Sequence, residues 1–224
     1  MFSLFKQKKQ PPKKQYDLNT KLSFAATNTS YLGTDNKYGN FLKEKGFELD
    51  QELSNDREKV FYNKDTKKSI ISYKGTTDYK DVKADLDGIA LGDYNHPEFE
   101  LANKSYENVK NKYGDNILLS GHSLGGSKAI NVGKKYNIED NAVVFNPGTS
   151  PLRKLETNAI VFRDPNDLVS NSITGNRINN LETKKTVTYG FGNGFDGSIA
   201  GLAQYGNDQL QSHTISGFDS EFDF

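Results

Sequence analysis

Residues 121–126, Gly-His-Ser-Leu-Gly-Gly, constrain the fold of this chain more than any other stretch. They fit G-x-S-x-G, the pattern of a nucleophile elbow, which is a sharp strand-to-helix turn that exposes a serine. The apolar run 116–120 before the motif has the length of a strand, and 124–136 after it has the apolar spacing of a helix. Glycines suit the turn, since Cβ atoms there would collide with the strand or the helix behind it. The sequence therefore predicts that Ser123 points out at the carboxyl end of a sheet.

Patterns of helix and strand alternate along the rest of the chain. Helical spacing predicts helices at 18–31, 38–45, 97–113 and 124–136; short β-rich runs predict strands at 47–53, 59–62, 69–73, 116–120, 142–145, 159–162 and 185–189. A polar turn at 63–68 joins two of the strands into a hairpin, and the glycine-rich stretch 190–206 reads as an irregular loop. Strands alternating with helices from 69 to 162 predict an α/β fold, with a mostly parallel central sheet flanked by helices.

Composition excludes several kinds of chemistry. The 224 residues contain no cysteine, which excludes disulfides, a thiol nucleophile and Cys-ligated zinc, and three histidines are too few for a His-rich metal site. Lysine plus arginine equals aspartate plus glutamate at 29 each, so no global charge indicates a nucleic-acid partner. We therefore expect an activity that needs neither metal nor cofactor.

The first 16 residues differ from the remainder. They are rich in lysine and contain Pro11-Pro12, which predicts a basic flexible tail ahead of a single domain at 17–224. A second interpretation is a weak contact with an anionic membrane surface, to which each lysine contributes about 1 kcal/mol. The order of charge and apolar residues is not that of a signal peptide, and no apolar run approaches 18 residues. These features predict a cytoplasmic or otherwise intracellular protein.

A serine nucleophile needs a base and an acid that orients the base. The chain order on an elbow of this kind is serine, then acid, then histidine, and only His213 lies downstream of Ser123. Two acids follow the strand at 159–162, namely Asp164 and Asp167, and spacing alone leaves both open. The competing interpretation of the motif is an ordinary glycine-rich turn between a strand and a helix.

The transition state of acyl transfer also needs backbone N–H donors for a developing oxyanion. One donor comes from the residue after the nucleophile, here Leu124. The other comes from a loop after an earlier strand, and Gly75-Thr76 ends the strand at 69–73. Gly75 permits close approach of the backbone, and the hydroxyl of Thr76 can add a hydrogen bond.

These segments together resemble the class 3 lipases, the fungal-lipase-like branch of the α/β-hydrolases. Residues 121–126 match that family's G-H-S-L-G-G in full, 73–76 look like the strand end that carries its oxyanion residue, and 166–169 are similar to its N-D-I-V around the triad aspartate. The histidine segment at 213–215 is a weaker match. The resemblance implies a triad of Ser123, Asp167 and His213, with Thr76 and Leu124 as the oxyanion hole.

Two departures qualify the resemblance. Ser170 stands where the family often has proline, and the segment in the place of the family's lid, 77–91, is rich in Asp and Lys instead of apolar residues. We expect a serine carboxylic-ester hydrolase acting on lipid esters, triacylglycerol or phospholipid. The alternatives are a soluble esterase or thioesterase with the same triad, and a hydrolase-like binding protein without turnover. Acyl length, head group and oligomeric state stay open.

Overall fold

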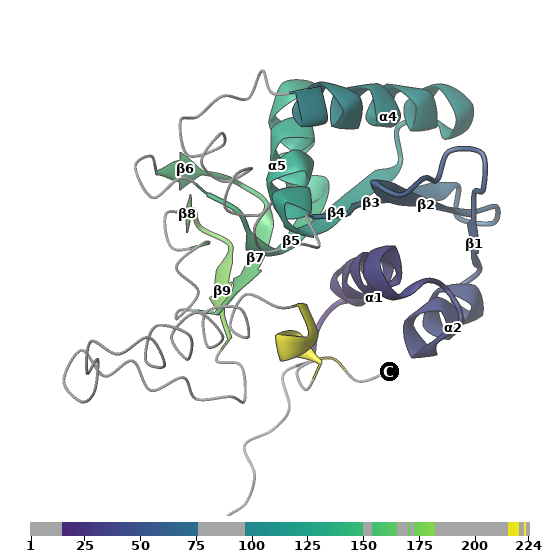
Figure 1. Ribbon diagram of the computed structural model, residues 1–224, viewed down its shortest axis with the longest axis horizontal. Helices are drawn as coiled ribbons and strands as arrows, with labels where there is room; N and C mark the ends of the chain where they lie inside the picture. Colours follow the sequence, from purple (N-terminus) through teal and green to yellow (C-terminus); the bar gives the residue numbers. More distant parts are fainter. Residues whose placement is uncertain are drawn as a thin grey trace, which may run out of the picture.

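Three layers make up the described part of the chain: helices, a central sheet, and helices again (Figure 1). The computed structural model describes residues 15–75, 97–149, 154–164, 170, 173–181, 215–219 and 222. The helices are α1 (Leu18–Leu32), α2 (Lys37–Glu44), α4 (Pro97–Tyr113) and α5 (Leu124–Tyr136). Two short 3-10 helices, η1 (Glu139–Asn141) and η2 (Ile215–Phe218), complete the helical elements of these residues.

Seven strands of the described residues form one twisted sheet, in the order β1-β2-β3-β4-β5-β7-β9. Their bounds are Phe47–Leu49, Glu58–Asn63, Lys68–Tyr73, Ile117–Ser123, Ala142–Pro147, Ile160–Arg163 and Ile178–Asn180. The pairs β1·β2 and β2·β3 are antiparallel, whereas every pair from β3 to β9 is parallel. Beside this sheet, β6 (Leu155–Glu156) and β8 (Ile173–Thr174) form a separate two-stranded one. The mostly parallel α/β architecture predicted from the sequence is confirmed.

The central strands are apolar on both faces because both faces are covered. On β3, Ile70 packs into the core on the α1 side and Ile71 into the core on the α4–α5 side. Leu118 and Leu119 divide in the same way on β4. Successive residues of a strand point to opposite faces of the sheet, and here both faces receive apolar side chains. These two strands therefore lie between two layers of helices.

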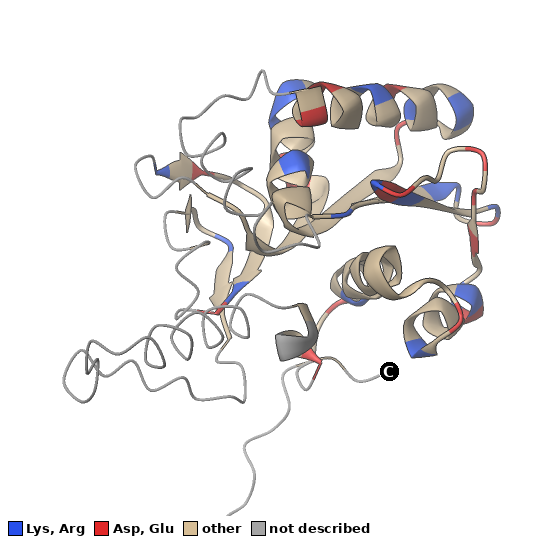
Figure 2. Cartoon of the chain, viewed as in Figure 1, with Lys and Arg blue, Asp and Glu red and all other residues tan. Residues whose placement is uncertain are grey.

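Helix α1 is buried on nearly every side over residues 22–30. Figure 2 shows it almost free of the charged side chains that mark the outer helices and loops. Its small polar residues satisfy their hydrogen bonds inside the protein: Ser30 donates to the hydroxyl of Ser72 at 2.8 Å, and Thr27 pairs with Ser120 at 3.1 Å. Short hydroxyl side chains let the helix approach the sheet closely and leave few buried polar groups unmet.

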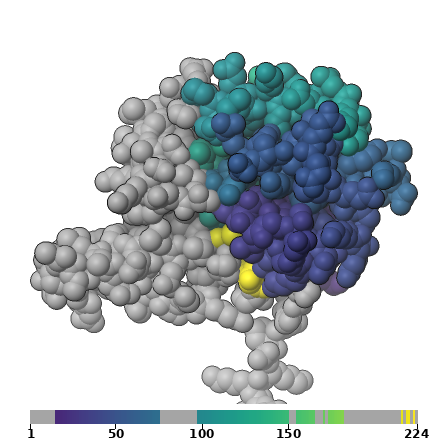
Figure 3. All heavy atoms as spheres, turned by 45° about the vertical axis from the view of Figure 1, so that its right-hand side comes forward, coloured from purple at the N-terminus to yellow at the C-terminus, as the bar shows by residue number. Residues whose placement is uncertain are grey.

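The C-terminal segment returns to the N-terminal helices. Phe218 and Phe222 are buried in the same core as residues of α1 and α2, and the ring of Phe222 stacks on Phe24 at 4.2 Å between centroids. In Figure 3 this yellow segment lies against the purple surface of the first helices. Tyr16, the last residue of the predicted tail, also contacts Phe222, with 4.7 Å between ring centroids.

The predicted strands differ from the observed ones in the bounds of β1 and in number, since the short strands β6, β8 and β9 were not predicted. The strand predicted at 47–53 ends at Leu49, because the carboxylate of Asp50 accepts the amides of Glu52 and Leu53 and turns the chain. Strand β9 was not predicted; its sequence, Ile-Asn-Asn, lacks an apolar run. The strand predicted at 185–189 and the loop at 190–206 lie outside the described residues.

Candidate active site

Ser123 stands on the sharp turn that the motif predicts. Strand β4 ends at Ser123 and helix α5 begins at Leu124. The backbone of Ser123 has φ 56° and ψ −129°, a conformation that L-residues rarely adopt and that costs of order 1–3 kcal/mol. Its carbonyl oxygen accepts the amide of Gly148 at 2.9 Å and the hydroxyl of Ser127 at 3.4 Å, and these bonds hold the strained residue. Strand, strained serine and helix together have the geometry of a nucleophile elbow.

Close packing explains the glycines that flank the serine. A Cβ atom at Gly125 would lie 2.0 Å from the carbonyl oxygen of Tyr73, and one at Gly121 would lie 2.4 Å from the carbonyl oxygen of Gly125. Backbone atoms cannot yield by that much. The glycines therefore let α5 begin directly against β3 and β4, as the sequence predicted.

The strand end predicted to supply the oxyanion hole lies beside the elbow. Strands β3 and β4 pair in parallel as far as Tyr73 and Gly121. A Cβ atom built on Gly75 would lie 3.1 Å from the Cβ of Ser123, so the backbone at Gly75 almost touches the serine. The amide of Gly75 donates to the hydroxyl of Tyr31 at 2.8 Å. Thr76, the next residue, lies outside the described residues.

Leu124, the second predicted oxyanion residue, is the first residue of α5. Its amide belongs to the first turn of the helix, whose N–H groups have no partner within the helix and carry the positive end of its dipole. The side chain is buried against Phe99 of α4. The backbone there is well placed to stabilise negative charge.

Of the two candidate acids, the structure describes Asp164. This residue directly follows β7 and is 1% exposed. Its amide donates to the side-chain oxygen of Asn146 at 2.8 Å, and Asn146 itself has φ 38°. Asp167 and His213 lie in segments that the structure does not describe, so their distances to Ser123 stay predictions.

The imidazole of His122, the residue before Ser123, contacts Tyr31. Its Nδ1 lies 3.3 Å from the hydroxyl of Tyr31, and the two rings meet edge to face with centroids 5.8 Å apart. Sequence reasoning missed Tyr31 because a tyrosine near the end of an apolar helix resembles core. Its place beside the elbow is shown by its hydrogen bond to Gly75, a residue 44 positions later in the chain.

A buried ion pair behind the elbow was also missed. Lys128 of α5 is 4% exposed and forms an ion pair with Glu98 in the first turn of α4, which Arg57 approaches at 3.4 Å. Burial raises the pKa of nearby Glu58, although hydrogen bonds from Asn55 and Ser105 counteract part of that shift. A lysine at this helical position is typical of a solvated face, so no sequence signal distinguished it.

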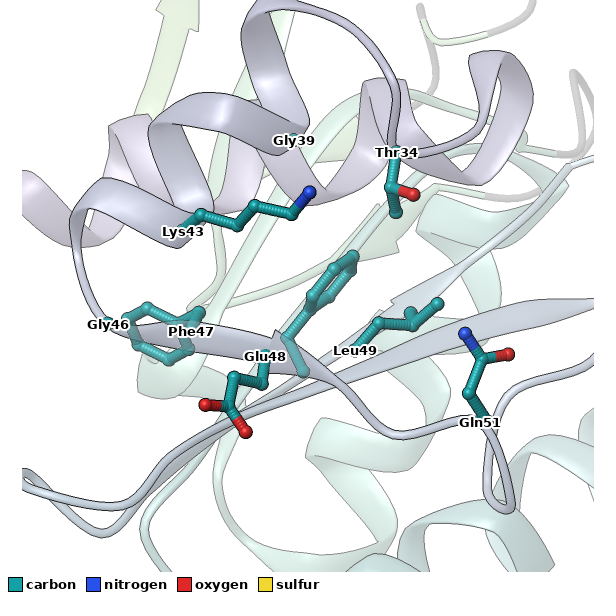
Figure 4. Close-up of a pocket in the computed structure, with 9 residues that line it drawn as sticks. Thr34, Gly39, Lys43, Gly46, Phe47, Glu48, Leu49 and Gln51 are labelled. Atoms are coloured by element: carbon teal, nitrogen blue, oxygen red, sulfur yellow. The ribbon is translucent and has the colours of Figure 1, made fainter.

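A cavity among the described residues lies away from Ser123. A space of about 490 Å³ opens at the antiparallel edge of the sheet, and its lining includes Phe47, Leu49 and Phe61. The side chain of Lys43 extends over it from α2 toward Thr34 (Figure 4). The lining includes no residue of β4 or α5 and no histidine, so this cavity carries none of the elbow's chemistry.

Neither a metal cluster nor a membrane-spanning helix occurs among the described residues. They contain no group of three or more His, Asp or Glu side chains suited to hold a metal ion. Within the same ranges, none of the helices has the length and apolar character needed to cross a bilayer.

Comparison with known proteins gives a partial match. The sequence profile of an uncharacterised protein family, UPF0227, matches residues 73–162, which run from the end of β3 through the elbow to β7. No curated protein sequence matches the chain.

Three solved structures are similar in fold, all of them fungal lipases. A Rhizomucor miehei lipase–propeptide complex has 13% identity and a TM-score of 0.41, over 68% of this chain and 61% of that one. A lipase from Rhizopus microsporus var. chinensis has 14% identity and a TM-score of 0.38, over 68% and 67%. A fungal lipase–inhibitor complex, described as a model for interfacial activation, has 19% identity and a TM-score of 0.39, over 72% and 68%. The chain spans less than two thirds of the first of these structures.

Proposed function

We propose that this protein hydrolyses carboxylic esters through an acyl-enzyme on Ser123. The observation that carries the proposal is the φ of 56° at Ser123, on a turn whose glycines admit no side chain. Strain of this kind persists only where the surrounding structure enforces it, and it clusters at functional sites. An ordinary strand-to-helix connection needs no strained serine.

The proposed chemistry uses the site residues that the sequence predicts. Ser123 attacks the ester carbonyl while His213 takes its proton, and His213 then returns that proton to the leaving alcohol. Asp167 orients the imidazole. The amides of Leu124 and Thr76 stabilise the oxyanion that forms on the carbonyl oxygen. Water then attacks the acyl carbonyl while His213 takes its proton, and His213 gives that proton to the Ser123 oxygen as the bond to the acyl group breaks.

Lipid esters are the proposed substrate class. The proposal rests on the resemblance of residues 121–126 and 166–169 to the motifs of class 3 lipases. The lysine-rich residues 1–16 would add a weak attraction to an anionic lipid surface, worth about 1 kcal/mol per lysine near that surface.

A fluorophosphonate probe tests the reaction class, because labelling needs an activated serine. We expect wild-type protein to be labelled and Ser123→Ala to take no label. A panel of p-nitrophenyl esters, thioesters and phospholipids on the same samples then defines the substrate. Ser123→Ala and His213→Ala should each lower kcat by about 10⁴–10⁶, and the double variant should be little worse than either single one. Full hydrolysis by His213→Ala would overturn the assignment of the base.

A further inference from the structure

One side chain joins the strand end at Gly75 to the nucleophile elbow. The hydroxyl of Tyr31, from the last turn of α1, accepts the amide of Gly75 at 2.8 Å. The same oxygen lies 3.3 Å from Nδ1 of His122 and 3.5 Å from the carbonyl oxygen of His122. Tyr31 therefore contacts both Gly75, the residue before Thr76, and His122, the residue before Ser123.

The chemistry of the two groups fixes the direction of the hydrogen bond between Gly75 and Tyr31. Burial raises the pKa of Tyr31, a shift that the amide of Gly75 only partly counteracts, so the hydroxyl keeps its proton at neutral pH. The amide of Gly75 can only donate, so the hydroxyl accepts that bond and has one proton left to give. Two acceptors on His122 lie within reach of that proton: the carbonyl oxygen, and Nδ1 when the neutral ring carries its own proton on Nε2.

The ring of Tyr31 is fixed as well as its hydroxyl. It meets the His122 ring edge to face, at 75° between planes and 5.8 Å between centroids. The ammonium of Lys74 lies over the tyrosine ring at 5.7 Å. These contacts restrict the side chain to one position, from which the hydroxyl reaches Gly75.

Because of the bond to Tyr31, the amide of Gly75 is not available to donate to an oxyanion. The next amide along the chain is that of Thr76. Gly75 is held with almost no free space, because a Cβ atom there would lie 2.6 Å from the carbonyl oxygen of His122 and 2.7 Å from the hydroxyl of Tyr31.

We propose that Tyr31 is a positioning residue of the hydrolase, one that holds the oxyanion strand end at its working distance from Ser123. The inference rests on the proposed function and adds a residue 92 positions before the nucleophile, from 123 − 31. Tyr31 touches neither substrate nor reacting atoms in this assignment. Its effect is on the transition state, since an oxyanion donor acts only when the carbonyl oxygen gains charge.

Tyr31→Phe tests the inference because it removes the hydroxyl and keeps the ring. Misplacing a catalytic group by about 1 Å can cost about 10²-fold, so we expect kcat to fall between about tenfold and 10²-fold while KM changes less than about threefold. The matched control is Tyr113→Phe, which loses a 2.6 Å bond to Asp50 at the antiparallel side of the sheet. It should lower the melting temperature and leave kcat unchanged.

Two outcomes of the kinetics overturn the proposal. One is a Tyr31→Phe variant whose kcat stays within about twofold of wild type. The other is an equal loss of kcat in Tyr31→Phe and Tyr113→Phe, which marks a general effect of lower stability.

A second measurement tests the hydrogen bond between Tyr31 and Gly75 without relying on enzymatic activity. Hydrogen exchange of the Gly75 amide should accelerate at least about tenfold in Tyr31→Phe and stay unchanged in Tyr113→Phe. The ring nitrogen resonances of His122 should change in the same variant, because the hydroxyl 3.3 Å from Nδ1 is removed. Unchanged exchange at Gly75 overturns the link itself. A wild-type protein that takes no fluorophosphonate label overturns the proposed function, and faster exchange at Gly75 then shows that Tyr31 is a structural link only.

Discussion

The hydroxyl of Tyr38 on α2 donates a hydrogen bond to the carboxylate of Asp219, 181 positions later in the chain. Burial raises the pKa of Tyr38 and the carboxylate raises it further, so the phenol stays a donor at neutral pH. The ammonium of Lys37 lies 3.9 Å from the other carboxylate oxygen. Together with buried Phe218, this bond attaches the C-terminal segment to the α1–α2 side of the sheet.

The first prediction follows from that attachment. Helix η2 begins at Ile215, two residues after the predicted base His213, so loosening the segment should affect the base. Tyr38→Phe should lower the free energy of unfolding by about 1.5 kcal/mol, the value of a hydrogen bond to a charged group, and should reduce kcat. Chemical unfolding and initial rates on one preparation check both.

Lys37→Ala is the matched control for Tyr38→Phe. It removes an exposed, long ion pair to the same carboxylate, which contributes less than about 1 kcal/mol. We expect near wild-type stability and kcat. If Lys37→Ala and Tyr38→Phe behave alike, the tyrosine bond is not what anchors the segment.

The second prediction separates the two acids. Asp167→Asn should lower kcat by about 10⁴ because the imidazole takes the wrong tautomer. Asp164→Asn should change kcat far less, and its effect should appear in the melt, since Asp164 is 1% exposed beside Asn146. Steady-state rates with a thermal melt of each variant distinguish the two. The reverse ranking would move the triad acid to Asp164.

The third prediction concerns the packing of the elbow. Gly125→Ala places a methyl 2.0 Å from the Tyr73 carbonyl oxygen, so α5 must move away from β3. We expect a loss of more than about 3 kcal/mol of stability, beyond the usual range for single substitutions, together with loss of fluorophosphonate labelling. Gly114→Ala is the control. It meets nothing within 4 Å and carries only the strain of φ 90°, about 1–2 kcal/mol, so labelling should survive.

The fourth prediction concerns pH. Burial raises the pKa of Asp50, but hydrogen bonds from Lys112, Tyr113 and the Leu53 amide outweigh it and hold the pKa at about 2, below the ordinary value of 3.8. A depressed pKa means that the carboxylate stabilises the fold fully above the ordinary value. That contribution is lost as the pH falls from about 4 toward 2.

Asp50→Asn isolates this charge, because asparagine keeps an oxygen for the turn at Glu52 and Leu53. The variant should be less stable than wild type by about 1–3 kcal/mol at pH 7, and the difference should shrink below pH 4. Urea unfolding at several pH values measures it. If the difference in the free energy of unfolding stays constant down to pH 3, the charge of Asp50 is not its cause.

The elbow could be predicted from the sequence because its causes are local. Glycines at 121 and 125, an apolar strand before them and helical spacing after them act within 20 residues. The same holds for the parallel strands at 142–147 and 160–163, whose apolar runs reflect burial on both faces. Strand β9 escaped prediction because an edge strand with two asparagines has no such run.

What only the tertiary structure decided are the contacts between distant segments. Six consecutive residues determine Ser123 and its strained turn, but the hydroxyl that binds Gly75 comes from Tyr31, on a helix separated from β4 by three strands in the chain. The Tyr38–Asp219 bond and the Lys128–Glu98 pair are likewise set by how helices stack on the sheet. Periodicity reports which face of an element is buried, but not which side chain of another element meets it there, because that depends on layer spacing and register.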